Sequence, residues 1–479
     1  MDTPLVIDKG VTICPPLTAI QADWMKDLLE NRDKLRSLID QYGSPINIHS
    51  TVPFVENYKE YVSTLQTHRL DHKIFYARKA NKCLAFVKAA HENGFCVDTA
   101  SYNELKQCLD LGMDGSRLVL TAAIKTEQLI RLAIENGVLI ILDNVDEIEV
   151  VSKIARELET AAPIGIRVSG FEVNGEKLYS RFGFDIDETK TVVFNHIKSN
   201  SSLIFQGFHF HLNGYSIEQR AVALAAVAEL SDVFATHGMN TKFIDIGGGL
   251  LMNYLQSGEQ WQYFIDTLKS AVSGEADPVT FQNNGLGFQM IDGELKGELA
   301  TYPYYNESPR DRFLDKVLSY TVGGQAVAKM LADRGIALHL EPGRSLLDQT
   351  GITLAEVIYR KRDSQGNLLV GLNMNRTQLC SSSADYLLDP VYLPAENNMA
   401  NNDPVGVYFV GAYCLEQDLI LKRKIAIPHY PQVGDLVCFL NTAGYMMHFY
   451  ETEAHQFNLS TNLILHAGDA ISLDEVHKV

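Results

Sequence analysis

Short apolar runs alternate with helix-length segments over the first two thirds of the chain. Each run has the length of a buried strand, and about eight occur between residues 46 and 340, at 74–77, 95–98, 118–120, 139–142, 164–168, 204–211, 243–246 and 337–340. Strands that alternate with helices in this way are typical of a parallel sheet. Eight such units predict a (β/α)8 barrel of the TIM type, and we expect this barrel domain to span residues 46–345.

The pattern changes after about residue 350, where strand-like segments are separated by short turns. This spacing predicts an all-β C-terminal domain, a sandwich or a barrel, over residues 346–479. Residues 1–45 are expected to form an extension that packs with this domain and contains a helix over residues 22–42.

The segment between the glycines at 247–249 and Glu341 is longer than a minimal barrel unit requires. We predict an insertion around residues 275–320, with a hairpin that turns at Asp292 and Gly293. Long loops inside compact domains are usually functional or mobile, so this insertion is a candidate functional element.

Composition limits the classes of partner. The chain has 41 basic and 59 acidic residues, a net charge of −18, which argues against nucleic acid or an anionic membrane as a partner. Its seven cysteines are scattered without paired spacing, which indicates reduced thiols and a cytoplasmic location. The sequence shows neither a signal-peptide pattern nor a run of about 18 apolar residues, so we expect no membrane partner.

Candidate chemistry begins at the end of the first barrel strand. Lys79 follows that strand, and Asp98 ends the next one. In TIM barrels the catalytic groups lie at the carboxyl ends of the strands. A lysine there could form a Schiff base if burial or a neighbouring charge keeps its amine partly neutral, whereas the alternative is an ordinary solvated loop lysine.

Three later strand ends carry further candidates. His209 and His211 are expected on one face of a strand, either packed in the barrel or as an HxH metal site. The glycines at 247–249 form either an anion-binding turn or simply a tight turn. Glu341 could pair with a heterocyclic nitrogen, and Arg344 suits a phosphate, although a surface ion pair is the simpler alternative.

The C-terminal domain adds Cys414, in GAYCLEQD, and Tyr445, in NTAGYMMHFY. A cysteine between turn elements is more often a buried packing residue than a reactive thiol. Taken singly, these residues leave the chemistry open.

Together, the motifs resemble the fold-type III pyridoxal-phosphate enzymes, namely the diaminopimelate, ornithine and arginine decarboxylases and, more distantly, alanine racemase. The resemblance covers about residues 45–460. It is carried by the order of YARKAN, DTASYNE, SRFG, HFHL, GGG, EPGR, a cysteine with an aspartate four residues later, and AGY. The long insertion indicates a divergent subgroup.

The resemblance implies a site for pyridoxal 5'-phosphate. Lys79 would hold the cofactor as an internal aldimine, His211 would stack on its ring, and Glu341 would keep the pyridine nitrogen protonated, so that the ring withdraws electrons. The other implied cofactor-binding residues are Asp98 and Glu104 near the lysine, Arg167 behind the ring, and Gly248, Gly249, Gly343, Arg344 and Tyr445 around the phosphate.

The family position of Cys414 is that of a proton donor that crosses a head-to-tail interface to the other subunit's cofactor. The resemblance therefore implies a homodimer with shared active sites and an amino-acid substrate. It implies no metal.

The chain departs from the family pattern where the substrate's far end should bind. Asn213 stands where these decarboxylases often have a phosphate-binding serine, and Leu415 stands where the diaminopimelate enzymes have an acid. Their substrate-binding arginine in RPxLY has no match, which leaves Asp385, Glu416 and Asp418 as the substrate-binding candidates.

The predicted activity is decarboxylation of a diaminopimelate-like, basic or polar amino acid. The alternatives are a racemase and a cofactor-binding homologue without catalysis. Racemases of this fold usually place an arginine against the pyridine nitrogen, so Glu341 favours the decarboxylase.

Overall fold

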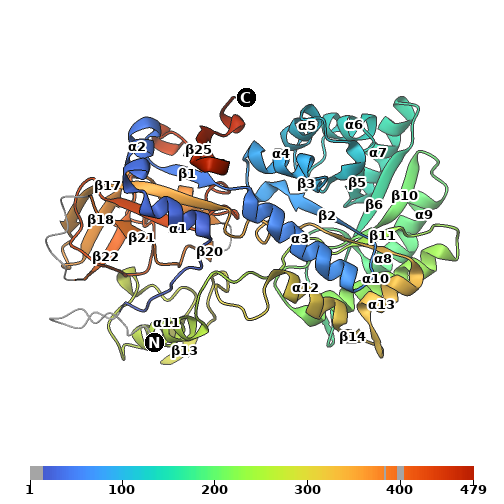
Figure 1. The fold of residues 1–479 in the computed structure, drawn as a ribbon. Helices are drawn as coiled ribbons and strands as arrows, with labels where there is room; N and C mark the ends of the chain where they lie inside the picture. The colour runs from blue at the N-terminus through green and yellow to red at the C-terminus, as the bar shows by residue number, and fades with distance from the viewer. Residues whose placement is uncertain (1–13, 382–383, 396–403, 479) are drawn as a thin grey trace.

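The computed structural model describes residues 14–381, 384–395 and 404–478. A barrel and a β-rich body lie side by side, and the chain crosses between them more than once (Figure 1). No helix in the described part of the chain is long and apolar enough to span a membrane.

The barrel contains the eight predicted strands in a closed parallel sheet. They are β2 (His72–Ala77), β3 (Cys96–Thr99), β4 (Leu118–Leu120), β5 (Leu139–Leu142), β6 (Ala162–Ser169), β10 (Leu203–His209), β11 (Phe243–Asp245) and β16 (Ala337–Leu340). Their order is β10-β11-β16-β2-β3-β4-β5-β6, and pairing of β10 with β6 closes the ring. The predicted fold class is thereby confirmed. Strand β10 ends at His209, so the expectation that His211 belongs to the same strand is wrong.

Helices surround the barrel and bury one apolar side against it (Figure 1). They are α3 (Val52–Thr67), α4 (Leu84–Glu92), α5 (Tyr102–Asp110), α6 (Glu127–Glu135), α7 (Val145–Glu157), α9 (Phe194–Lys198), α10 (Ile217–Ala235), α12 (Arg310–Ser319) and α13 (Val327–Arg334). Several begin at a polar residue whose side chain accepts a backbone N–H, as Ser101, Thr126 and Asn144 do. These caps fix where each helix starts after its strand.

The β-rich body contains most of the strands after residue 350. They are β17 (Gly351–Arg362), β18 (Leu368–Leu372), β21 (Val391–Leu393), β22 (Val405–Val410), β23 (Ile425–Ile427), β24 (Leu436–Leu440), β25 (Thr461–Leu465) and β26 (Ile471–Leu473). Their inward residues form a second apolar core, separate from that of the barrel.

Strand β1 (Ile46–His49) corrects the expected start of the barrel. It pairs antiparallel with β17 and parallel with β25, inside the sheet of the β-rich body. All four of its residues are buried, so the strand needs a sheet neighbour on each side, which the C-terminal strands provide. The barrel strands therefore begin with β2.

The expected single helix over residues 22–42 is two helices, α1 (Asp23–Glu30) and α2 (Arg32–Tyr42). Asn31 breaks them because its backbone is non-helical and its side chain accepts the N–H of Lys34. Both helices bury apolar residues in the core of the β-rich body.

The segment after β11 contains α11 (Gly258–Val272) and the strands β12 (Gln289–Ile291) and β13 (Glu294–Lys296). The two strands form the predicted hairpin, with Asp292 and Gly293 at positive φ in its turn. The N–H of Phe281 donates to the carbonyl of Lys422, at 2.8 Å, so this insertion is fastened to the β-rich body.

The remaining elements are short: β7 (Glu172–Val173), β8 (Glu176–Lys177), β9 (Phe184–Asp185), α8 (Ile186–Glu188), β14 (Thr321–Val322), β15 (Gln325–Ala326), β19 (Cys380–Ser381) and β20 (Ala384–Asp385), with several single helical turns.

Candidate active site

A cavity of about 500 Å³ opens where the carboxyl ends of the barrel strands meet the segment around Tyr445. Its volume is in the range of small-molecule sites. Its lining includes the predicted residues Lys79, Arg167, His211, Gly248, Gly249, Glu341, Gly343, Arg344 and Tyr445, together with His209. The barrel topology thus assembles most of the residues selected from the sequence.

Lys79 lies in the turn directly after β2. Its Nζ donates to Asp98 Oδ2 at 2.8 Å; the Asp98 side chain is fully buried, whereas 37% of the Lys79 side chain is exposed towards the cavity. Burial opposes the charge on Lys79, but the nearby carboxylates of Asp98 and Glu341 raise its pKa above the ordinary value. An incoming ligand can reach the amine while Asp98 holds it in place.

Glu341 follows β16 and is almost completely buried. Its Oε1 lies 3.2 Å from His209 Nε2, yet neither atom makes a hydrogen bond with the described residues. Burial raises the pKa of Glu341, although the charges of Lys79 and Arg167 act against this rise. A buried carboxylate oxygen without a partner is costly, and a ligand that donates a hydrogen bond or carries a positive charge would satisfy it.

His211 is oriented by the glycine turn after β11. The N–H of Gly248 donates to His211 Nδ1 at 3.1 Å, so the neutral ring carries its proton on Nε2. Burial lowers the pKa of His211 well below the ordinary value. A Cβ on Gly247 would lie 2.4 Å from His211 Nδ1, and one on Gly248 would lie 2.5 Å from the Glu341 carbonyl oxygen. This close approach explains why glycine stands at both positions.

Arg344 and Tyr445 close the other side of the cavity. The Arg344 guanidinium lies over the rings of Tyr302 and Tyr445, at 4.6 and 5.2 Å from their centroids, and donates to the Gly444 carbonyl. The backbone N–H of Tyr445 donates to the carbonyl of Ala80, next to Lys79. The β-rich body therefore completes the cavity directly beside the lysine.

Arg167 projects from β6, with its guanidinium 4.3 Å from the centroid of the Phe182 ring and 3.7 Å from Asp143. Glu104 acts differently from what was expected. Its carboxylate accepts the N–H of Ala100 at 2.7 Å and does not line the cavity. Glu104 thus fixes the turn after β3, where Ala100 does line the cavity.

Thr121, Phe182, Tyr215 and Tyr302 also line the cavity but were not among the predicted site residues, although Phe182 lies in the SRFG motif. Tyr302 belongs to the aromatic segment TYPYYNESPRDR of the insertion, whose unusual composition was the available signal. Thr121 donates to Asp98 and so supports the partner of Lys79.

Comparison with known proteins shows which family the chain resembles. Residues 53–284 match the model of the pyridoxal-dependent decarboxylase pyridoxal binding domain. The uncharacterized protein y4yA of Sinorhizobium fredii is 29% identical over 87% of this chain and 86% of its own length. Diaminopimelate decarboxylase of Staphylococcus aureus is 22% identical over 86% of each chain. Over most of its length the chain is therefore similar to the fold-type III pyridoxal-dependent decarboxylases.

Solved structures agree on the fold of this family. Diaminopimelate decarboxylase from M. jannaschii, in complex with L-lysine, has a TM-score of 0.68 at 17% identity and covers 92% of this chain and 91% of its own. Lysine decarboxylase from Selenomonas ruminantium has a TM-score of 0.65 at 17% identity and covers 94% and 98%.

The cavity fits pyridoxal phosphate, the cofactor of this decarboxylase family. The amine of Lys79 is accessible, and the unpartnered Glu341 Oε1 can meet the protonated pyridine nitrogen. A Cβ on Gly343 would lie 2.7 Å from the Tyr445 hydroxyl, so glycine keeps this wall open for a bulky ligand. Arg344 supplies the positive charge that a phosphate needs.

The four residues assigned to proton donation or substrate binding lie outside the lining of this decarboxylase cavity. Cys414 and Glu416 are exposed on one turn, and Asp385 accepts an ion pair from Lys422 at 2.7 Å. Asp418 is buried and accepts the backbone N–H groups of Arg376 and Tyr413 at 2.9 and 2.8 Å. Asp418 therefore shapes the turn that carries Cys414 and does not face a substrate within its own chain.

Proposed function

We propose that this protein decarboxylates the α-carbon of an amino acid that has a polar or cationic side chain. The observation that supports this most is the pairing of two groups in one cavity. They are the accessible amine of Lys79 and the buried carboxylate of Glu341, whose Oε1 makes no hydrogen bond with the described residues. An acid at that position favours loss of carbon dioxide, because it keeps a positive charge on the ring that must accept electrons.

Bound pyridoxal phosphate supplies a conjugated ring that accepts the electron pair left behind when carbon dioxide departs. Lys79 would hold the cofactor covalently, with Asp98 orienting its amine. Glu341 would hold a proton at the pyridine nitrogen, and the neutral imidazole of His211 would support the ring. Arg344, Tyr445 and the glycines would hold the phosphate.

After carbon dioxide leaves, a proton must be added to the α-carbon. We assign this role to the thiol of Cys414, delivered from a second subunit, since Cys414 does not line the cavity of its own chain. Leu415 beside it is 56% exposed, so this turn lies at the surface of its own chain. The groups that bind the far end of the substrate would then include residues from the same turn, such as Glu416.

A substrate screen tests this function. The protein loaded with pyridoxal phosphate is incubated with single L- and D-amino acids, and carbon dioxide and amine are measured together. Equal amounts of both products are expected from a basic or polar amino acid. An enantiomer formed without carbon dioxide would identify a racemase instead, and no turnover of any amino acid would contradict the proposal.

Two variants make the screen specific. Lys79→Ala should lose both the visible absorbance of the bound cofactor and all carbon dioxide release. Lys88→Ala is the matched control, because Lys88 only forms a surface ion pair with Glu475. This control should behave like the parent protein.

A further inference from the structure

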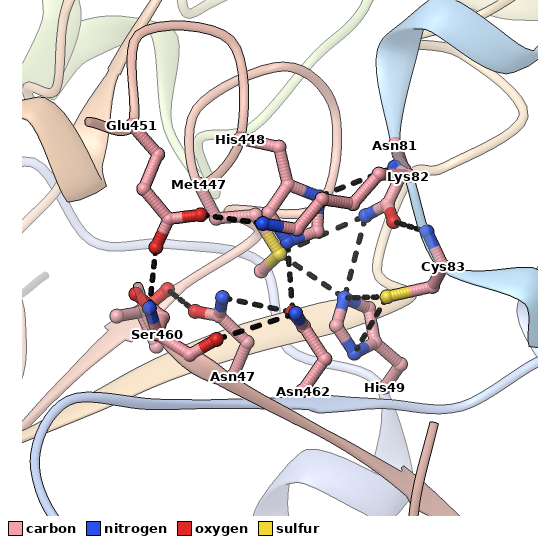
Figure 2. Close-up of polar contacts among 11 residues, drawn as sticks. Asn47, His49, Asn81, Lys82, Cys83, Met447, His448, Glu451, Ser460 and Asn462 are labelled. Carbon is pink, nitrogen blue, oxygen red and sulfur yellow. Dashed lines mark hydrogen bonds and ion pairs between the residues drawn. The ribbon is translucent and has the colours of Figure 1, made fainter. Parts of the chain in front are cut away.

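The junction of the two bodies shows how this chain stabilises a buried charge. The side chain of Glu451 is 1% exposed, and its carboxylate lies 2.7 Å from Lys82 Nζ and accepts the N–H of Ser460 at 2.5 Å (Figure 2). Likewise, the buried guanidinium of Arg423 lies 3.0 Å from the carboxylate of Asp389. Each of these buried charges has a counter-charge within the chain.

Arg220 is buried without a counter-charge. It lies near the beginning of α10, is 1% exposed, and forms no ion pair with the described residues; its Nε makes no hydrogen bond with them either. Burial lowers the pKa of Arg220 to about 10, so the guanidinium still carries its charge at neutral pH. The dipole of α10 also disfavours a cation at this end of the helix. The described residues therefore do not offset the cost of this charge.

The guanidinium of Arg220 links two turns at the carboxyl ends of the barrel strands. Its Nη2 donates to the carbonyl oxygens of Gly214 and Gly249, at 2.8 and 2.9 Å. Gly214 follows β10, and Gly249 follows β11 and lines the cofactor cavity. A Cβ on Gly249 would lie 2.6 Å from Nη2, so only glycine allows this contact. Arg220 thus lies directly behind the glycine turn of the cavity.

These two hydrogen bonds also set the direction of two backbone N–H groups. In a trans peptide the N–H points away from the C=O, so the N–H groups of Tyr215 and Leu250 point away from Arg220. Both residues line the cavity, and neither N–H donates to another group in the described part of the chain. Unpaired N–H groups of successive turns are characteristic of anion-binding sites.

The charge of a phosphate ester gives a reason for a second cation at this wall. Such a group carries about −1.5 to −2 at pH 7, more than the single charge of Arg344 can neutralise. Asn213, which stands in the place of the family's serine, is exposed and does not line the cavity. Arg220 and the N–H groups that it orients are therefore available to replace that serine.

We propose that Arg220 is a positioning residue for the phosphate of the cofactor. Its guanidinium holds the Gly214 and Gly249 carbonyls so that the N–H groups of Tyr215 and Leu250 face the phosphate, and its charge balances part of the phosphate charge from behind the turn. This inference rests on the proposed function, because it requires that the cavity binds pyridoxal phosphate.

A comparison of pyridoxal phosphate with pyridoxal, which lacks the phosphate, tests this role on the full cofactor-free chain. Arg220→Gln should bind pyridoxal phosphate at least roughly tenfold more weakly but pyridoxal as tightly as the parent does, with both affinities followed by visible absorbance. Arg220→Lys can keep a positive charge but lacks the rigid fork that reaches two carbonyls, so it should show a smaller loss with the same selectivity.

Arg423→Gln is the matched control. It also removes a buried guanidinium, but Arg423 does not line the cavity. This variant should lower the melting temperature without changing the ratio of the two affinities. Thermal unfolding verifies that each variant is folded, and Arg220→Lys decides the question if Arg220→Gln does not fold.

Phosphorus NMR of the loaded protein gives a readout that a merely structural role would not move. A nearby positive charge favours the doubly ionised phosphate, so the bound phosphate of the parent should titrate below the pKa of about 6 of a free ester. In Arg220→Gln this titration should move up by about half a pH unit or more.

Equal weakening of pyridoxal phosphate and pyridoxal binding in the Arg220 variants would overturn the inference, as would a phosphate titration that is the same in parent and variant. A different result bears on the proposed function. If the parent gains no visible absorbance with pyridoxal phosphate, or if Lys79→Ala leaves that absorbance unchanged, the cofactor site itself is wrong.

Discussion

Lys79 Nζ donates a hydrogen bond to the fully buried Asp98 Oδ2 at 2.8 Å. Lys79 lies in the turn after β2, and Asp98 lies in β3 opposite Ala77, so the parallel pairing of those strands sets their distance. Asp98 in turn accepts a hydrogen bond from Thr121 at the end of β4. The lysine that is proposed to carry the cofactor is therefore held by a chain of contacts across three strands.

This contact predicts how fast the cofactor-free protein takes up pyridoxal phosphate. Only the neutral amine attacks a carbonyl, and Asp98 raises the pKa of Lys79, so uptake should accelerate as the pH rises. Asp98→Asn removes the negative charge and lowers the Lys79 pKa. Its rate profile, followed by visible absorbance, should shift to lower pH. Superimposable profiles would show that Asp98 does not control the lysine.

Substitution of Glu341 is expected to lower activity but to stabilise the folded protein at higher pH. Glu341→Gln removes the acid from the pyridine nitrogen, and kcat for carbon dioxide release should fall roughly 100-fold or more while the cofactor stays bound. The exposed Glu416 provides a control for stability, since Glu416→Gln should leave unfolding unchanged.

The pH dependence of unfolding separates these effects. Burial raises the Glu341 pKa above that of the unfolded chain, so the folded cofactor-free protein binds more protons and loses stability as the pH rises from about 4.3 through the raised pKa. Glu341→Gln removes this loss. Urea titrations between about pH 4 and pH 8 should show the free energy of unfolding of the variant rising relative to that of the parent. A difference in unfolding free energy that does not change with pH would contradict this.

The barrel was predictable because each of its strands is a short apolar run between helical segments. Strand β1 was not, since a buried strand reads the same whichever sheet it joins, and its partners at 351–354 and 461–464 lie hundreds of residues away. The break at Asn31 carries no glycine or proline, so only the capping side chain reveals it.

The candidate site shows the same division. Residues at strand ends, such as Lys79 and Glu341, were predictable because parallel strands bring their carboxyl ends together. Tyr302 reaches the cavity from a long insertion, and the carboxylate of Asp418 accepts hydrogen bonds from two backbone N–H groups. The local sequence reveals neither arrangement. The substrate-binding residues stay a prediction for the same reason.

Asp418 gives a test of structural against substrate-binding roles. Asp418→Asn replaces an acceptor of two backbone N–H groups with an amide, and unfolding should become easier by about 1–3 kcal/mol in urea titrations. The ratio of kcat/KM between two substrates should stay the same. A changed ratio with unchanged stability would restore Asp418 as a substrate-binding residue.

Substitutions of Gly343 and Tyr445 are expected to have coupled effects on cofactor binding. A Cβ on Gly343 would lie 2.7 Å from the Tyr445 hydroxyl and 3.0 Å from the Ala80 Cβ. Gly343→Ala should therefore displace the hydroxyl and weaken pyridoxal phosphate binding by about 1–3 kcal/mol, because overpacking forces neighbouring groups to move. Tyr445→Phe alone should weaken binding by less, since it removes one hydrogen-bonding group and leaves the wall intact.

The double variant decides whether the hydroxyl causes the effect. In the Tyr445→Phe background the alanine meets no hydroxyl, so Gly343→Ala should cost less there, with a coupling energy of about 0.5–3 kcal/mol in the dissociation constants. Gly406→Ala is the matched control, because its Cβ would meet only the flexible Lys424 side chain and the Cys14 sulfur, at 3.2 Å or more. If the losses in binding free energy from the two substitutions are strictly additive, the alanine is crowded by Ala80 and not by the hydroxyl. Tyr445 would then not belong to the proposed phosphate site.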